Sequence, residues 1–246
     1  MVERQHRPAL NLYVPGGLVP RAAVDLPDAA AHHARVRRAD AGDPVILTDG
    51  KGTRAAGVID ATGKSRVSVV VESLTQVPPP APVHLLVPVA DRDRMLLAAE
   101  KCTELQVTSW RPVRWARSRS VSPRGEGDRF REKVTARMVA ALEQSGGAWL
   151  PDIWPESEPA EALQSAQDIA ERFILDASGL AIRAMPATHA VALAVGPEGG
   201  FEEDEVALAT SLGWVRMALG ASTLRFETAL IVAVAVVRAQ QHTHRS

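Results

Sequence analysis

A proline cluster divides this chain of 246 residues into two parts. Residues 78–82 read Pro-Pro-Pro-Ala-Pro. Because proline fixes φ and has no backbone N–H, neither a helix nor a central strand can continue through this segment. We therefore expect a linker at 77–82, a first domain at 1–76 and a second domain at 83–246.

The first part carries short β-like patterns separated by turns. Asp49-Gly50-Lys51-Gly52 and Ala61-Thr62-Gly63-Lys64 are the clearest turn clusters. One helical pattern covers 29–38. These features predict a small β-barrel with one helix. Its strands are expected at 10–14, 44–48, 55–59 and 66–74.

In the second part, strand and helix patterns alternate. The continuous apolar run 83–89 is typical of a strand that is covered on both faces. A helical pattern follows at 91–105. Such alternation predicts a mostly parallel α/β sheet flanked by helices. Further strands are expected at 111–115, 172–176, 190–195 and 214–218, further helices at 129–144, 202–212 and 229–237, and a loop with a surface helix at 151–166.

Composition narrows the protein class. With 46% hydrophobic and 23% charged residues, the chain is expected to be a soluble globular protein. The single cysteine, Cys102, allows no internal disulfide and indicates a reducing cytoplasm, where it is expected to be a buried apolar residue. The apolar run 229–237 is too short to cross a membrane. No metal site is expected, because His32 and His33 have no metal-ligand spacing to other residues.

The segment Gly196-Pro197-Glu198-Gly199-Gly200 follows the strand predicted at 190–195. Ligands of open α/β sheets bind at the carboxyl ends of the strands, and glycines let the backbone approach a ligand closely. A tight turn without a ligand is the alternative interpretation.

The charge of this segment indicates the kind of ligand. Glu198 and the acidic run 202–205 would repel phosphate, and no Gly-Lys-Ser/Thr sequence is present. The run 202–205 is also expected to stabilise the start of a helix. The loop therefore suits a neutral or cationic ligand, such as a nucleoside that carries a sulfonium.

A second strand-to-helix turn lies at 217–228. Gly220 is expected to turn the chain, and Ser222 or Thr223 is expected to cap the helix that follows. Taken alone, this pattern is weak evidence for a site.

Together, the two turns resemble a known signature. Gly196-Pro197-Glu198-Gly199-Gly200-Phe201, followed by Leu219-Gly220 and Leu224-Arg225-Phe226-Glu227-Thr228-Ala229, resembles the C-terminal signature of the bacterial 16S rRNA uridine-N3 methyltransferase family. That family belongs to the SPOUT class of trefoil-knotted methyltransferases. The resemblance extends over nearly the whole chain, in order, through His32-His33-Ala34-Arg35-Val36-Arg37-Arg38, Gly42-Asp43, Asp49-Gly50-Lys51-Gly52, Glu100-Lys101-Cys102-Thr103-Glu104-Leu105 and Glu143-Gln144-Ser145-Gly146.

The resemblance implies a fold, a cofactor and partners. It implies an N-terminal PUA-like β-barrel that helps to hold RNA and a C-terminal knotted SPOUT-like domain that dimerises. The cofactor would be S-adenosylmethionine, and the substrate would be 16S rRNA or the assembled small ribosomal subunit. The implied cofactor-binding residues are Leu193, Gly196, Pro197, Glu198, Gly199, Gly200, Leu219, Gly220, Ser222, Thr223 and Leu224.

The implied reaction is attack by uridine N3 on the sulfonium methyl group. Most of the acceleration is expected from alignment of the reacting atoms. Arg225 is the candidate for steadying the developing uracil anion or an RNA phosphate. Glu198 is the candidate for orienting the amino group of the cofactor or the target base.

Three departures from the family pattern leave other functions open. Ala221-Ser222-Thr223 stands where the family usually has Pro-Arg-Ile, Gln106 stands where it has glycine, and Gly147 stands where it has arginine. An RNA-binding or ribosome-assembly factor on a catalytically decayed scaffold is therefore the alternative. A nucleotide-dependent α/β enzyme is a third reading, which the acidic loop disfavours.

Two stretches are locally basic, and one of them is the N-terminal segment with Arg4, Arg7, Arg21, Arg35, Arg37 and Arg38. Residues 111–137 hold nine basic and three acidic side chains, beside Trp110 and Trp115. Arginines with stacking aromatics suit RNA phosphates and splayed bases, whereas a solvated charged surface is the alternative. The residues expected to bind RNA are Arg35, Arg37, Arg38, Arg117 and Arg119.

Overall fold

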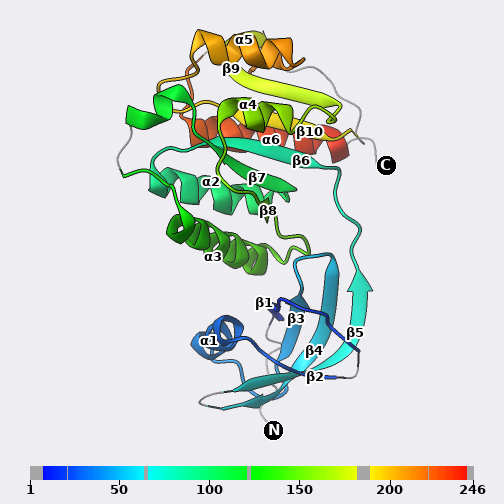
Figure 1. The fold of residues 1–246 in the computed structure, drawn as a ribbon. Helices are drawn as coiled ribbons and strands as arrows, with labels where there is room; N and C mark the ends of the chain where they lie inside the picture. The colour runs from blue at the N-terminus through cyan, green and yellow to red at the C-terminus, as the bar shows by residue number, and fades with distance from the viewer. Residues whose placement is uncertain are drawn as a thin grey trace. The chain divides into compact units, whose positions relative to one another are not determined.

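The chain forms two compact units, which we describe from a computed structural model (Figure 1). The first unit comprises Met1–Pro79 and Leu142–Leu150, and the second comprises Pro80–Ala141 and Pro151–Ser246. The division therefore lies inside the proline cluster, whereas the membership of Leu142–Leu150 in the first unit was not predicted. The structure describes residues 8–20, 22–63, 66–120, 123–181, 189–220 and 222–242.

The first unit is built on a five-stranded sheet with one helix. The strand order is β1-β3-β4-β5-β2, in which β1 and β3 are parallel and the other pairs are antiparallel. All four predicted strands and the predicted helix are present, but the short strand β2 was missed. The elements are β1 (Leu10–Tyr13), β2 (Ala23–Asp25), α1 (Asp28–Val36), β3 (Pro44–Thr48), β4 (Thr53–Thr62) and β5 (Val67–Gln76).

Leu142–Leu150 belongs to this unit through specific contacts. Glu143 accepts hydrogen bonds from the Tyr13 backbone N–H and pairs with His33 Nδ1, each at 2.8 Å. Gly52 has φ +96°, and a Cβ there would lie 2.4 Å from the Trp149 ring. The glycine at this turn is therefore required both by its backbone conformation and by the close approach of Trp149.

The second unit contains a six-stranded parallel sheet flanked by helices. The order β11-β9-β10-β6-β7-β8 is parallel at every pair, as the sequence predicted. The trefoil knot stays a prediction. The elements are β6 (Val83–Pro88), α2 (Arg92–Glu104), β7 (Ser109–Val113), the 3-10 helix η1 (Ala116–Ser120), α3 (Asp128–Ser145), β8 (Asp152–Ile153), α4 (Pro159–Gln164), β9 (Glu171–Ala181), β10 (Val191–Val195), α5 (Glu203–Ser211), β11 (Val215–Ala218) and α6 (Phe226–His242). The last residues of α3, from Leu142, belong to the first unit.

The helices bury the sheet. Helices α2 and α6 pack against each other, and α6 also packs on β10. Helix α4 packs on β7 and α5 on β11, so their side chains share a core with Ala192 and Ala194 of β10. The sequence predicted α4 as a surface helix, but Ala162 and Leu163 are fully buried. Helix α4 therefore covers the sheet and is not a solvated helix.

Helix α6 extends beyond the predicted range 229–237 at both ends, but it does not begin at the predicted cap. Its first residue is Phe226, and the Ala229 N–H donates to the Arg225 carbonyl at 2.9 Å. The expectation that Ser222 or Thr223 caps this helix is therefore wrong, because Arg225 occupies the position before the first helical residue. Ser222 and Thr223 instead lie in the preceding loop.

The pairing of β9 with β11 breaks at one point. Arg216 pairs with Ile174, but the next residue, Met217, pairs with Leu180. The β9 segment Leu175–Gly179 is thus left without partners in β11. Asp176 holds this segment in place, since it accepts hydrogen bonds from the Ser178 N–H at 2.8 Å and from Arg216 at 2.9 Å. The break displaces Leu175–Gly179 from the ladder next to the strand ends.

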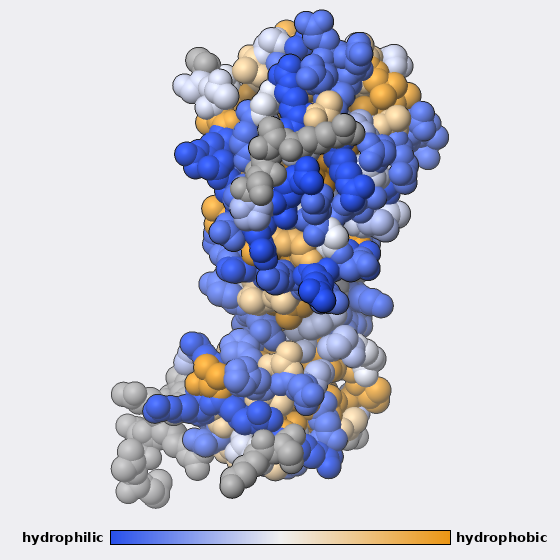
Figure 2. Space-filling view, turned by 60° about the vertical axis from the view of Figure 1, so that its left-hand side comes forward, coloured by the Kyte–Doolittle hydropathy of each residue, from blue (hydrophilic) through white to orange (hydrophobic). Residues whose placement is uncertain are grey.

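The surface is mostly polar on the face drawn in Figure 2, where hydrophobic residues form separate patches among hydrophilic ones. Among the residues that the structure describes, no helix combines the length and the apolar character needed to span a membrane.

We predict that Gly179→Ala destabilises the second unit. A Cβ at Gly179 would lie 2.5 Å from Met217 N and 2.6 Å from the Arg216 carbonyl carbon, and backbone atoms cannot move aside cheaply. We expect the free energy of unfolding in urea to fall by about 1–3 kcal/mol. Gly220→Ala is the matched control, because no atom lies within 4 Å of its Cβ position. Equal stabilities of the two variants would contradict this reading of the strand break.

We also predict that Cys102 is chemically inert in the folded protein. The side chain is fully buried on α2, and burial raises the pKa of its thiol. Because the thiolate is the reactive form, Ellman's reagent should not label the native protein at mildly alkaline pH. It should label one thiol in concentrated guanidinium chloride. Rapid labelling without denaturant would show that the thiol is accessible.

Candidate functional site

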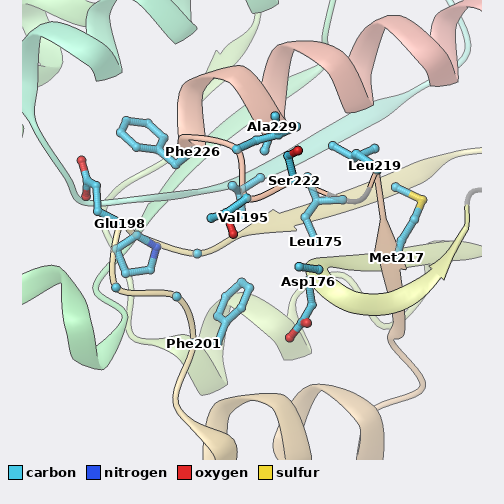
Figure 3. A pocket seen from close by; sticks show the side chains of 18 residues that line it. Leu175, Asp176, Val195, Glu198, Phe201, Met217, Leu219, Ser222, Phe226 and Ala229 are labelled. Carbon is cyan, nitrogen blue, oxygen red and sulfur yellow. The ribbon is translucent and has the colours of Figure 1, made fainter.

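A pocket of about 360 Å³ lies at the carboxyl ends of β9, β10 and β11 (Figure 3). Because all three strands are parallel, the loops that leave their ends meet at one edge of the sheet. Figure 3 shows Glu198 at one end of the pocket and Met217 at the other. The described residues that line it are Leu175, Asp176, Ala177, Val195, Gly196, Pro197, Glu198, Gly199, Gly200, Phe201, Met217, Leu219, Gly220, Ser222, Thr223, Leu224, Phe226 and Ala229.

The loop after β10 forms a tight turn over Phe201. The Gly200 N–H donates to the Pro197 carbonyl at 2.8 Å, and Gly200 has φ +74°. A Cβ at Gly196 would lie 3.1–3.3 Å from the Phe201 ring. Phe201 in turn meets Trp115 edge to face, with ring centroids 4.8 Å apart. The glycines thus bring the backbone close to an aromatic support.

The acidic run at 202–205 has the structural role that was predicted for it. Glu202 and Glu205 form a capping box at the start of α5, and Glu205 also accepts a hydrogen bond from the Ala116 N–H at 2.8 Å. Arg117 donates to both carboxylate oxygens of Glu202 and to the Gly199 carbonyl. These hydrogen bonds lower the pKa of Glu202. Arg117 therefore braces the glycine loop.

Arg94 joins the two signature segments. Its guanidinium lies 3.2 Å from Glu198 Oε1 and 3.9 Å from Glu227 Oε1. Glu227 is buried, and its Oε2 has no hydrogen-bond partner among the described residues. Arg94 was not singled out from the sequence. In the sequence it looks like an ordinary solvated arginine, because it lies in the first turn of a helix, after the N-cap Asp91.

The pocket has an acidic character. Burial raises the pKa of Asp176, but hydrogen bonds from Ser178 and Arg216 outweigh burial, so that its pKa lies below the ordinary value. Glu198 is a second acid in the lining, and none of the described lining residues is lysine or arginine. Such a lining favours a neutral or cationic ligand over a polyphosphate.

Of the residues predicted to bind the cofactor, all except Leu193 line this pocket, and the catalytic candidate Arg225 is not among the lining residues. Leu193 is fully buried within β10, between Leu85 and Phe173 of the neighbouring strands. Arg225 is exposed just before α6. Sequence reasoning missed the contribution of β9, although Asp176 at the end of a predicted strand was a signal. The other lining residues that it missed are Leu175, Ala177, Val195, Phe201, Met217, Phe226 and Ala229.

The residues predicted to bind RNA are divided between the two units. Arg35, Arg37 and Arg38 are exposed at the end of α1 in the first unit. Arg117 lies against Glu202 and Gly199 in the second unit. The side chain of Arg119 lies outside the described residues.

The expected stacking role of two tryptophans is wrong. Trp110 and Trp115 are both fully buried, since β7 and the turn after it place them in the core. Neither ring can stack on a base.

Among the described residues, no group of three or more potential ligands could hold a metal ion.

The sequence and fold of this chain are similar to those of known proteins. A family model described as an RNA methyltransferase domain matches residues 77–238, and one described as an RNA methyltransferase PUA domain matches residues 26–72. The ribosomal RNA small subunit methyltransferase E of Rickettsia conorii is 29% identical over 244 residues, which cover 93% of this chain and 94% of that protein. The enzyme of the same name from Bacillus subtilis is 25% identical over 221 residues, which cover 85% of this chain and 86% of that protein.

Two solved structures match nearly the whole fold. The Neisseria gonorrhoeae ribosomal RNA small subunit methyltransferase E, bound to S-adenosyl methionine, is 27% identical, with a TM-score of 0.82 and coverage of 94% of this chain and 97% of that one. A Legionella pneumophila protein in complex with the cofactor SAM is 26% identical, with a TM-score of 0.85 and coverage of 95% and 98%. Since the RNA methyltransferase model matches well over half of the sequence, the chain belongs to the RNA methyltransferase family.

Proposed function

We propose that this protein transfers the methyl group of S-adenosylmethionine (SAM) to N3 of a uridine in 16S rRNA. The observation that carries the proposal is the acidic pocket between the loop 196–200 and the loop 219–224. Its position at the carboxyl edge of a parallel sheet is typical of nucleoside-binding sites. The named relatives act on small-subunit ribosomal RNA, and the Neisseria gonorrhoeae relative binds SAM.

The residues present fit this cofactor. The pocket volume of about 360 Å³ is in the usual range for small ligands. At Gly220 a Cβ would meet no atom within 4 Å, so the backbone leaves open space there. The carboxylates of Asp176 and Glu198 are suited to a ligand that carries a sulfonium charge. We propose that the loops 196–200 and 219–224 hold the cofactor.

The cofactor supplies a methyl group activated by its positive sulfur, and the chain supplies alignment and charge. Arg94 fixes the direction of the Glu198 carboxylate at one end of the pocket. Arg225 is exposed beside the pocket, and no described residue pairs with its side chain. We propose that Arg225 stabilises the negative charge that develops on the uracil as N3 loses its proton. Glu198 would orient the cofactor or the base.

Other parts of the chain are proposed to serve the substrate and the assembly. The exposed Arg35, Arg37 and Arg38 would contact rRNA from the first unit. Helix α6 carries partly exposed apolar residues, including Ile231 and Val232, which suit an interface between two copies. We therefore propose a homodimer that acts in the cytoplasm on 16S rRNA or on the assembled small subunit.

A second function is favoured by one observation. Ser222 lines the pocket where the family usually has arginine. If this loss had abolished catalysis, the protein would be an RNA-binding or ribosome-assembly factor. Calorimetry separates the two functions, because tight RNA binding without SAM binding would support only the second.

We predict that the protein methylates small ribosomal subunits isolated from cells that lack this enzyme. With SAM labelled in the methyl group, digestion of the rRNA to nucleosides should give labelled 3-methyluridine. Gly196→Val should abolish labelling, because its side chain would crowd the Phe201 ring, which lies 3.1–3.3 Å from a Cβ at that position, and both residues line the pocket. Gly17→Ala is the control, since no atom lies within 4 Å of its Cβ position. Label in a different nucleoside, or none with the unmodified protein, would refute the proposal.

We further predict that Arg94→Ala weakens SAM binding about tenfold, as expected when hydrogen bonds to charged groups are lost. Glu198 would lose its partner, and the buried Glu227 would lose its nearest cation. Arg94→Lys should recover part of the affinity. Arg137→Ala removes a surface pair with Glu100 in the same unit and should leave affinity unchanged. Calorimetry measures all four proteins, and wild-type affinity in Arg94→Ala would contradict the role of this residue.

A further inference from the structure

Trp154 is an exposed aromatic side chain in an unusual setting. It follows the edge strand β8, and 46% of its surface is exposed. The Arg111 guanidinium lies over its ring, 4.6 Å from the ring centre, while the Arg111 side chain itself is only 11% exposed. This cation–π contact covers one face of the indole and fixes its orientation. The rest of the ring is presented to solvent.

Trp154 forms part of the wall of a second cavity, of about 240 Å³. The cavity lies within the second unit and is separate in lining from the cofactor pocket. Met95, Trp110 and Phe130 supply apolar surface. The Trp110 Nε1–H is buried and has no hydrogen-bond partner among the described residues. The Trp110 ring is fully buried, so a ligand in the cavity would not reach this donor.

Two arginines of the lining remain accessible. The side chains of Arg114 and Arg131 are 52% and 49% exposed. Arg114 is paired closely with Glu156 at 2.5 Å, whereas Arg131 is 4.0 Å from the highly exposed Asp128. Such a long, exposed ion pair contributes little free energy. Arg131 is therefore the side chain of this cavity that can most easily exchange its partner for a phosphate.

We propose that this cavity binds an unpaired nucleobase of the RNA substrate, stacked on Trp154, with the adjoining phosphate at Arg131. The inference rests on the proposed function, because it assigns a contact to the same RNA. A base has a flat π-face that can stack on the exposed indole of Trp154. A helix of a protein partner is a less suitable occupant, because an α-helix is about 10 Å across and too wide for a cavity of this volume. Arg131 belongs to the basic segment that was predicted to bind RNA, and Trp154 takes the stacking role that was expected of Trp110 and Trp115.

The proposal is tested by the affinity of purified 16S rRNA for Trp154 variants, measured by filter binding. Trp154→Ala should bind at least about fivefold more weakly, which is the lower end of the measured effect of losing one stacked base. Trp154→Phe keeps a ring and should stay within about twofold of the unmodified protein. Leu180→Ala, which removes another exposed hydrophobic side chain of the same unit, should have no effect.

Salt dependence tests the phosphate contact. Arg131→Gln should reduce the slope of log affinity against log salt concentration by about one. Trp154→Ala should leave that slope unchanged, because stacking releases no counterions. An unchanged slope for Arg131→Gln would overturn the assignment of the phosphate.

Failure of this inference is distinguishable from failure of the proposed function. Calorimetry with SAM on Trp154→Ala should give wild-type affinity, which also shows that the variant is folded. If Trp154→Ala binds SAM and binds rRNA as tightly as the unmodified protein, the base-binding cavity is refuted while the proposed function stands. If Trp154→Ala sediments differently from the unmodified protein but binds rRNA equally well, the base-binding cavity is also refuted, and this face is assigned to a protein contact. If the unmodified protein binds neither SAM nor rRNA, the proposed function itself fails.

Discussion

The register break between β9 and β11 is the constraint on which the site depends. Parallel pairing brings the ends of β9, β10 and β11 to one edge of the sheet, and the pairing of β9 with β11 is interrupted there. Because Leu175–Gly179 leaves the ladder, the backbone of β9 supplies a third wall to the pocket. Gly179 allows the close crossing of the two strands, and Asp176 ties the displaced segment to Arg216.

Ion pairs of two arginines connect segments of the site that are far apart in the sequence. Arg94 on α2 contacts the glycine loop through Glu198 and the start of α6 through Glu227. Arg117 donates a hydrogen bond to the Gly199 carbonyl of the same loop and is itself paired with Glu202. Both arginines are held by acids, so the positive charge near the pocket is largely neutralised. The charged side chains of the lining are the carboxylates of Asp176 and Glu198, each paired with an arginine, so the lining offers a phosphate no uncompensated positive charge.

Much of this fold could be predicted from the sequence, because buried parallel strands are continuous apolar runs and glycines mark their ends. The burial of Trp110 and Trp115 could not, since residue type does not reveal which face of a short strand is covered. Arg94 was likewise hidden, because its partners are more than a hundred residues away. Gln106 is informative in retrospect: its φ of 57° explains why the family favours glycine at that position.

The central claim is that the two loops at 196–200 and 219–224 enclose one cofactor. A crystal structure of the protein grown with SAM tests it most directly. The account predicts electron density for SAM in contact with both loops and with the displaced segment of β9. Density for SAM at any other place, or density that touches only one of the two loops, would contradict it.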